Sequence, residues 1–260
     1  MYINAAEGGH APAQWRLAIA YETGELNLAI DGDEALKWYR QAAESGHGWA
    51  LFCLGTAYEF GSLTLAINLE EALKWYQEAA DRGHPDAQYR LAVAYEHGEL
   101  NLAIDLVAAL MWFKKAAEGG NVYAQRRLGK AYEFGELTLA IDLDAARTWY
   151  QKAAEGGETL AQHRLFWASY DGTLGLKTDL EAASMWFKKA VNHDSEDEEQ
   201  DEEEDDLARL LRKLQVGIDA STGTAGAATV TGVYRGGDGR GGGRIVTIGL
   251  KCNVPLGTAI

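Results

Sequence analysis

The sequence predicts an all-α fold, a solenoid of five helix-turn-helix repeats with a period of 37 residues. The main observation is a set of evenly spaced tryptophans, each followed directly by tyrosine or phenylalanine and, four residues after the tryptophan, by alanine. These tryptophans are Trp38, Trp75, Trp112, Trp149 and Trp186, and we expect all of them to be buried. A second observation is an apolar helical stripe that recurs ahead of them at the same period. A constant period is typical of repeat proteins, in which one helical hairpin stacks on copies of itself.

The first helix of the first full repeat is predicted at about residues 11–23. Ala13, Leu17, Ala20 and Tyr21 fall at i, i+4, i+7 and i+8, which places them on one face of a helix. The small alanines allow two helices to approach closely, and the larger side chains fill the remaining space. Gly24 follows, at a position where a helix C-cap favours a left-handed residue.

The loop and the second helix follow the same period. Leu26, Leu28 and Ile30 alternate with other residues, so the loop is predicted to be extended, with some side chains packed between helices. Asp31 is a good N-cap residue for the second helix, which carries the tryptophan and ends near Gly46. Residues 2–9 resemble the last turn of an earlier second helix, so the chain starts in mid-repeat.

The stretches AQWRLAIAYETG and ALKWYRQAAESGH together resemble the Sel-1-like repeat, a relative of the tetratricopeptide repeat. The resemblance covers residues 5 to about 192 and implies a right-handed superhelical solenoid. It also implies a non-catalytic scaffold or adaptor for protein–protein interactions. The fifth unit departs from the pattern at Phe166 and Ser169, as expected of a terminal repeat.

Four segments are expected along the chain. The solenoid occupies residues 1–193, and residues 194–206, which hold 11 acids and no base, form a low-complexity linker. Residues 207–216 carry a leucine stripe that predicts a capping helix on the fifth repeat, so two interpretations of 194–216 stay open, a solvated spacer and a helical cap. Residues 217–260 form a glycine-rich tail, in which ATVTGVY and RIVTIGL predict two short strands of a β-hairpin. The Arg-Gly-Gly runs between them resemble RNA-binding tails, but the favoured interpretation is a flexible loop.

Charge and composition exclude several classes of function. The formal net charge of −15 argues against binding to nucleic acid or to anionic membranes. No apolar run is long enough to cross a membrane, and the N-terminus lacks the pattern of a signal peptide. We expect a cytoplasmic protein, although a targeting segment could precede a chain that starts in mid-repeat. Cys53 and Cys252 make no metal or redox motif, and His10, His47 and His84 are spread along the solenoid, so no metal and no cofactor are expected.

No catalytic motif is present, so we expect no enzymatic activity. The first hypothesis is a monomeric scaffold that binds a partner protein or a basic or amphipathic peptide. The alternative is an enzyme or an enzyme-regulatory subunit with a site that the sequence does not reveal.

The resemblance implies that the first helices line the concave face of the solenoid. Positions on these helices that point away from the core vary between repeats, except for a recurring glutamate that predicts an acidic ladder. We therefore predict a groove with aromatic anchors and a negative floor. The alternative is that the aromatic residues pack between adjacent first helices and the glutamates are solvated. The predicted partner-binding residues are Trp15, Ile19, Glu22, Phe52, Glu59, Phe60, Tyr89, Val93, Glu96, His97, Arg126, Lys130 and Glu133.

Overall fold

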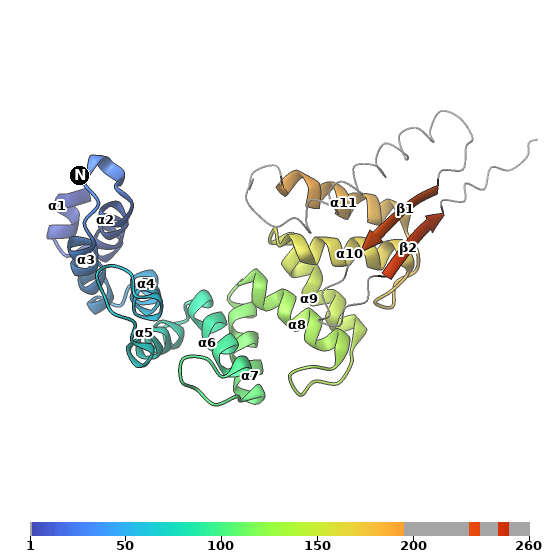
Figure 1. Ribbon diagram of the computed structural model, residues 1–260, viewed down its shortest axis with the longest axis horizontal. Coiled ribbons are helices and arrows are strands. Elements are labelled where there is room, and N and C mark those ends of the chain that lie inside the picture. The colour runs from blue at the N-terminus through green and yellow to red at the C-terminus, as the bar shows by residue number, and fades with distance from the viewer. Residues whose placement is uncertain (1, 195–228, 235–243, 250–260) are drawn as a thin grey trace, which may run out of the picture. The chain divides into compact units, whose positions relative to one another are not determined.

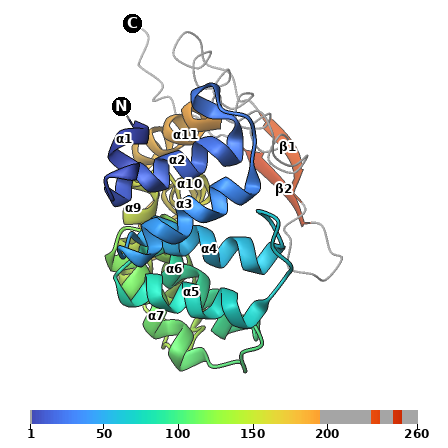
Figure 2. The ribbon, with the colours of Figure 1, turned by 90° about the vertical axis from the view of Figure 1, so that its left-hand side faces the viewer.

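A computed structural model describes residues 2–194, 229–234 and 244–249 of the chain (Figure 1). The chain divides into two compact units, Met1–Ala190 and Val191–Ile260. In the first unit, five helix pairs follow one another along the chain, as the colour sequence in Figures 1 and 2 shows. This arrangement confirms the predicted fold class, an all-helical solenoid of five helix pairs.

The helix bounds repeat with the sequence period. A short helix α1 (Tyr2–Glu7) precedes the pairs, and the last helix α11 continues into the second unit. The five pairs are α2 (Ala11–Thr23) with α3 (Gly32–Glu44), α4 (Gly48–Phe60) with α5 (Leu69–Asp81), α6 (Pro85–His97) with α7 (Leu106–Glu118), α8 (Val122–Phe134) with α9 (Leu143–Glu155), and α10 (Thr159–Asp171) with α11 (Leu180–Asp194).

Local capping sets these bounds. The side chain of Asp31 accepts hydrogen bonds from the backbone N–H groups of Asp33 and Glu34, which satisfies two donors at the start of α3. Gly24 adopts the left-handed conformation after α2, and its N–H donates to the carbonyl of Ala20. Both caps lie where the sequence predicts them, and equivalent caps recur in the later repeats.

The loop inside the first repeat differs from the predicted extended segment. Glu25–Asn27 forms a 3-10 turn, η1, in which Leu26 and Asn27 have φ values of 56° and 60°. The chain becomes extended only at Leu28, before the N–H of Asp31 donates to the carbonyl of Tyr21 over 2.8 Å. The loop therefore folds back onto the end of the first helix. A left-handed leucine recurs at the same position in every later repeat, at Leu63, Leu100, Leu137 and Leu174.

In the first four repeats, the aromatic residue after the tryptophan is more deeply buried than the tryptophan itself. Tyr39, Tyr76 and Phe113 are fully buried, whereas Trp75 and Trp149 are only partly buried, so the prediction that all five tryptophans are buried is wrong for these two. The tyrosine faces the first helix of its pair so closely that a Cβ added at Gly55 would lie 2.7 Å from the Tyr76 ring.

The tryptophans flank this contact, next to the polar surface of the second helix. The Nζ of Lys115 lies 4.2 Å from the centre of the Trp112 ring, and the Nζ of Lys152 lies 4.4 Å from that of Trp149. A lysine over an aromatic face is stabilised by the negative charge density of the ring. The tryptophans therefore join the core to a charged surface.

In the second unit, β1 (Thr229–Tyr234) and β2 (Arg244–Gly249) pair antiparallel, with Thr229 opposite Gly249 and Tyr234 opposite Arg244. These strands lie within the two segments in which the sequence predicts a hairpin. The predicted acidic linker at 194–206 lies outside the described residues except for Asp194, and the predicted capping helix at 207–216 lies wholly outside them. Among the described residues, every helix is too short or too polar to span a bilayer.

Candidate functional site

The predicted aromatic anchors lie between successive first helices. Trp15 on α2 stacks on Trp49 of α4 with ring centres 6.2 Å apart, and Phe52 stacks on His84, which precedes α6, at 5.3 Å. Tyr89 of α6 meets Tyr123 of α8 at 6.0 Å. Trp15, Phe52 and Tyr89 are half-buried, so these rings hold neighbouring repeats together and still present part of their surface to solvent.

Five of these rings form one continuous group, here called the aromatic cluster: Trp15, His47, Trp49, Phe52 and His84. At its centre, Trp49 contacts His84 edge to face with ring centres 4.4 Å apart, yet 47% of Trp49 is exposed. Trp49 and the equivalent Tyr123, which is also exposed, are not among the predicted binding residues. The signal was present, because the equivalent residues Pro12, Trp49, Asp86, Tyr123 and Leu160 vary between repeats, as the selected positions do.

The two histidines of the cluster both pack against its aromatic rings, but only His84 caps a helix with its side chain, since His47 makes no such hydrogen bond. Nδ1 of His84 accepts a hydrogen bond from the N–H of Ala87 over 3.4 Å. Burial lowers the pKa of both His47 and His84, which favours the neutral imidazole, the form in which Nδ1 of His84 can accept the cap hydrogen bond. Within the described ranges, no group of three histidine, cysteine, aspartate or glutamate residues is placed to hold a metal ion.

The other predicted residues fall into two groups. Ile19 and Val93 are half-buried, whereas Phe60, His97 and Lys130 are exposed. In the fourth repeat Arg126 replaces the aromatic anchor, and its Nε lies 2.8 Å from Oε1 of Glu158, the residue that precedes α10. At the position of the aromatic anchor, the contact with the next repeat thus changes from aromatic in the first three repeats to ionic in the fourth.

The predicted acidic ladder is mostly neutralised within the chain. Glu59, Glu96 and Glu133 each form a two-point ion pair with an arginine of the next first helix, and these contacts are here called the Glu–Arg bridges. The partners are Arg90, Arg127 and Arg164, respectively. The glutamate side chains are only 9%, 13% and 8% exposed, so they are neither a free negative floor nor solvated, and both expectations are wrong at these three positions.

Further hydrogen bonds extend the Glu–Arg bridges. Arg90 also pairs with Glu99 over 2.6 Å, and Arg127 pairs with Glu136 over 2.7 Å. The hydroxyl of Tyr76 donates to Glu59 over 2.8 Å. Burial is the largest cause that raises the pKa of Tyr76, and the bond to Glu59 raises it further, whereas a hydrogen bond with Thr56 lowers it. Charge-assisted, two-point contacts of this kind are stronger than neutral hydrogen bonds, so the bridges fix one first helix against the next.

The junction between the first and second repeats departs from this pattern. Cys53 stands where the later repeats have the bridging arginine, and Ser62 stands where the third and fourth repeats have Glu99 and Glu136. Glu22 keeps its position, is exposed, and accepts a hydrogen bond of 2.6 Å from the hydroxyl of Tyr39. Burial, the largest cause, raises the pKa of the Cys53 thiol to about 11, so the neutral thiol does not compensate the charge of Glu22.

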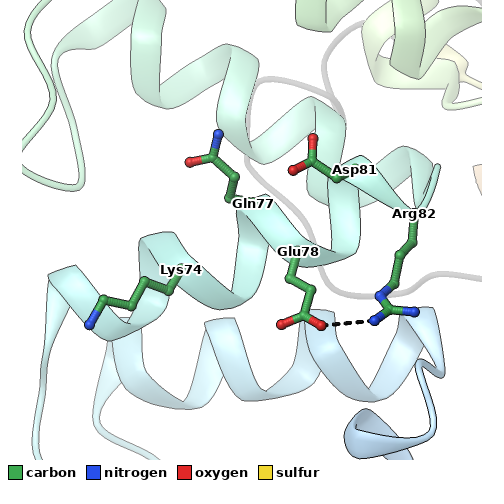
Figure 3. Close-up of a pocket in the computed structure, with 5 residues that line it drawn as sticks. All are labelled: Lys74, Gln77, Glu78, Asp81 and Arg82. Carbon is green, nitrogen blue, oxygen red and sulfur yellow. Dashed lines mark hydrogen bonds and ion pairs between the residues drawn. The ribbon is translucent and has the colours of Figure 1, made fainter.

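A separate hollow lies on α5, away from the predicted residues (Figure 3). It is lined by Lys74, Gln77, Glu78 and Asp81 of this helix and by Arg82, the residue that follows its end. Glu78 and Arg82 point toward one another and form an ion pair of 3.0 Å, whereas Lys74 points away from them (Figure 3). This hollow brings together no aromatic anchor, in contrast to the face formed by the first helices.

Comparisons with known proteins agree with the repeat pattern. A family model, the Sel1 repeat, matches residues 11–47, 50–84, 85–121, 122–158 and 159–195. A solved structure of a protective antigen present in uropathogenic Escherichia coli strains, which displays an SLR fold, is 33% identical with a TM-score of 0.64, and the match covers 74% of this chain but only 40% of that one. The structure of a Sel1 repeat protein from Oxalobacter formigenes is 30% identical with a TM-score of 0.64, and the match covers 72% of this chain and 76% of that one. No curated protein matches the chain.

Proposed function

The chain belongs to the Sel1 repeat family, and from this premise we propose that it is a non-catalytic scaffold that binds a partner protein on the face formed by its first helices. Sel1 repeat proteins are generally scaffolds for protein interactions, and the fold is typically non-enzymatic. We expect this face to be the concave one, as in related solenoids. The formal net charge of −15 favours a protein partner over nucleic acid.

The observation that carries the proposal is the set of partly exposed aromatic side chains along α2, α4, α6 and α8. Trp49 and Tyr123 are 47% and 52% exposed, and the half-buried anchors Trp15, Phe52 and Tyr89 lie beside them. Tryptophan and tyrosine are the residues that most often carry binding energy at protein interfaces. Because ring contacts with the next repeat hold these side chains in place, little conformational entropy is lost when a partner covers them.

The test compares partner capture by the purified full chain and by a Trp49→Ala/Tyr89→Ala variant, followed by calorimetry with the purified partner. The expected result is a loss of affinity of at least about tenfold, because truncation of interface aromatics commonly costs 2 kcal/mol or more. The matched control is Val107→Ala/Met111→Ala on the second helix α7, where both side chains are also exposed. Unchanged affinity in the aromatic variant, or an equal loss in the control, would contradict a site on the first helices.

A further inference from the structure

Four junctions join the five first helices, and one of them lacks a partner that the others possess. At three junctions a glutamate of one repeat binds the guanidinium of an arginine 31 residues later. At the first junction Glu22 occupies the equivalent place, but residue 53 is cysteine. The three later junctions therefore show, within this chain, which chemical group a carboxylate at this position binds.

Glu22 is accessible and already oriented. It is exposed, whereas the side chains of Glu59, Glu96 and Glu133 are largely covered by their arginines. The hydroxyl of Tyr39 donates to its Oε2 over 2.6 Å, as the hydroxyls of Tyr76 and Tyr150 do to the bridged glutamates. The carboxylate is therefore held as it is in a Glu–Arg bridge, while its other oxygen carries no hydrogen bond from the described residues.

The second acid that holds the arginine at two of the three later junctions is also absent here. Arg90 and Arg127 each contact a second glutamate nine residues later, and the residue equivalent to that glutamate in the second repeat is Ser62. The arginine and its second acid are thus both replaced, but Glu22 and Tyr39 are retained. A carboxylate retained without its internal cation is available to a cation from outside the chain.

Apolar surface lies next to this carboxylate. Trp15, Ile19 and Glu22 are spaced at i, i+4 and i+7 on α2, so they lie along one side of the helix. Trp15 and Ile19 are half-buried, and Trp15 also belongs to the aromatic cluster. A ligand that reaches Glu22 can therefore also contact an apolar surface about two helical turns long.

We propose that Glu22 and Tyr39 form a receptor site for an arginine side chain of a partner protein, which takes the place of the arginine that the chain itself supplies at the other three junctions. An apolar residue near this arginine in the partner packs on Trp15 and Ile19. Arginine is favoured over lysine because a planar guanidinium binds a carboxylate through two parallel hydrogen bonds. This inference rests on the proposed function, since it assigns one contact within the face of the first helices.

The test uses the full chain and the peptide acetyl-Leu-Arg-Leu-amide, together with counterparts that carry lysine or citrulline instead of arginine. Binding is followed by two-dimensional NMR, with the Trp15 indole and the backbone amides of Glu22 and Tyr39 as reporters. The arginine peptide is expected to shift these resonances, the lysine peptide to bind several-fold more weakly, and the citrulline peptide not to bind. Equal shifts with arginine and citrulline, or no shift with arginine, would overturn the proposal.

Two variants separate a specific site from a solvated carboxylate. Glu22→Gln removes the charge, and Cys53→Arg supplies the internal guanidinium that Arg90, Arg127 and Arg164 supply elsewhere. Both are expected to abolish the arginine-specific shifts, whereas Cys53→Ser leaves them unchanged. Retained shifts in Cys53→Arg, with an unfolding temperature at or above that of the wild type, would show that the peptide binds elsewhere.

Binding of the identified partner to the aromatic double variant and to Glu22→Gln distinguishes the arginine site from the proposed function, a protein-binding face on the first helices. If Trp49→Ala/Tyr89→Ala weakens the partner and Glu22→Gln does not, the face binds proteins but the arginine site is wrong. If Glu22→Gln abolishes peptide binding and neither variant affects the partner, the arginine site exists but the proposed scaffold face is wrong.

Discussion

Neighbouring first helices are held together by different contacts at the first junction and at the three junctions that follow. At the later junctions, Glu–Arg bridges connect α4 to α6, α6 to α8, and α8 to α10. At the first, Cys53 replaces the arginine, and ring contacts of Trp15 with His47 and Trp49 connect α2 to α4. The helices on both sides keep the same length of 13 residues.

This comparison shows that the backbone repeat does not depend on one type of contact. Alanine and leucine positions and the caps repeat with the period, so they set the helix bounds, whereas the residues between first helices are free to change. Ring contacts occur at the second and third junctions too, but only the first lacks the bridging arginine, which leaves one carboxylate, Glu22, exposed there. Variation at a fixed position in a repeat thus changes surface chemistry without changing the fold.

The largest expected effect comes from breaking a Glu–Arg bridge. Arg127→Ala removes the cation that faces Glu96, whose side chain is 13% exposed, and should cost about 2–4 kcal/mol of stability, because it leaves a mostly buried charge without a partner. Urea unfolding followed by circular dichroism measures this cost. Cys53→Ala, the matched change at the first junction, should cost less than about 1 kcal/mol. Equal losses in the two variants would mean that the bridges do not distinguish the junctions.

A smaller effect should come from removing the centre of the aromatic cluster. Trp49→Ala loses the ring contacts with Trp15 and His84 and should cost about 1–2 kcal/mol, although half of this side chain is exposed. The matched variant is Tyr123→Ala in the fourth repeat, which loses a ring contact with Tyr89 alone. Thermal unfolding of both variants compares them, and a larger loss for Tyr123→Ala would contradict a special role of aromatic packing near the first junction.

Completing the missing bridge should stabilise the chain slightly. Cys53→Arg places a guanidinium opposite Glu22 and should add about 1 kcal/mol, the typical net value of a partly exposed charged hydrogen bond. Cys53→Lys is the control, and it should add less because an ammonium cannot bind the carboxylate through two parallel N–H groups. A loss of stability in Cys53→Arg would indicate that the first junction has a different helix spacing from the other three.

The smallest effect expected is a dependence of folding stability on pH that comes from the histidines of the aromatic cluster. Burial lowers the pKa of His84, and neighbouring His47 lowers it further while Asp86 opposes them, so the unfolded chain binds a proton more readily than the folded chain. Stability should therefore be complete above the ordinary histidine pKa of about 6.5 and fall as the pH decreases below it. His84→Asn, which copies the natural cap Asn121, should reduce this dependence in melting temperatures measured between about pH 8 and 5.5. An unchanged dependence in this variant would assign it to other groups.

Much of the fold was predictable because its determinants are local. Asp31 and Gly24 lie within one or two residues of the helix ends that they cap, so the sequence alone locates those ends. The left-handed leucine of the loop was not predictable from alternation, because the fold-back depends on a hydrogen bond from Asp31 to Tyr21 across the loop. That Trp15, Phe52 and Tyr89 lie on one side of the first helices was also predictable, since a helix presents residues at fixed angles.

The chemistry of that face depended on the tertiary structure. The sequence shows a glutamate at every period, but whether it is solvated, bound or free depends on which side chain of the next repeat lies opposite. Glu59 and Arg90 are 31 residues apart, and they meet only because α4 and α6 pack with a particular shift and rotation. Helical periodicity predicts the direction in which a side chain points about the axis of its own helix. A contact between two helices also depends on the distance and the angle between the two helix axes. For this reason the period determined five helix pairs, and only the packed helices decided that three carboxylates are neutralised while Glu22 stays exposed.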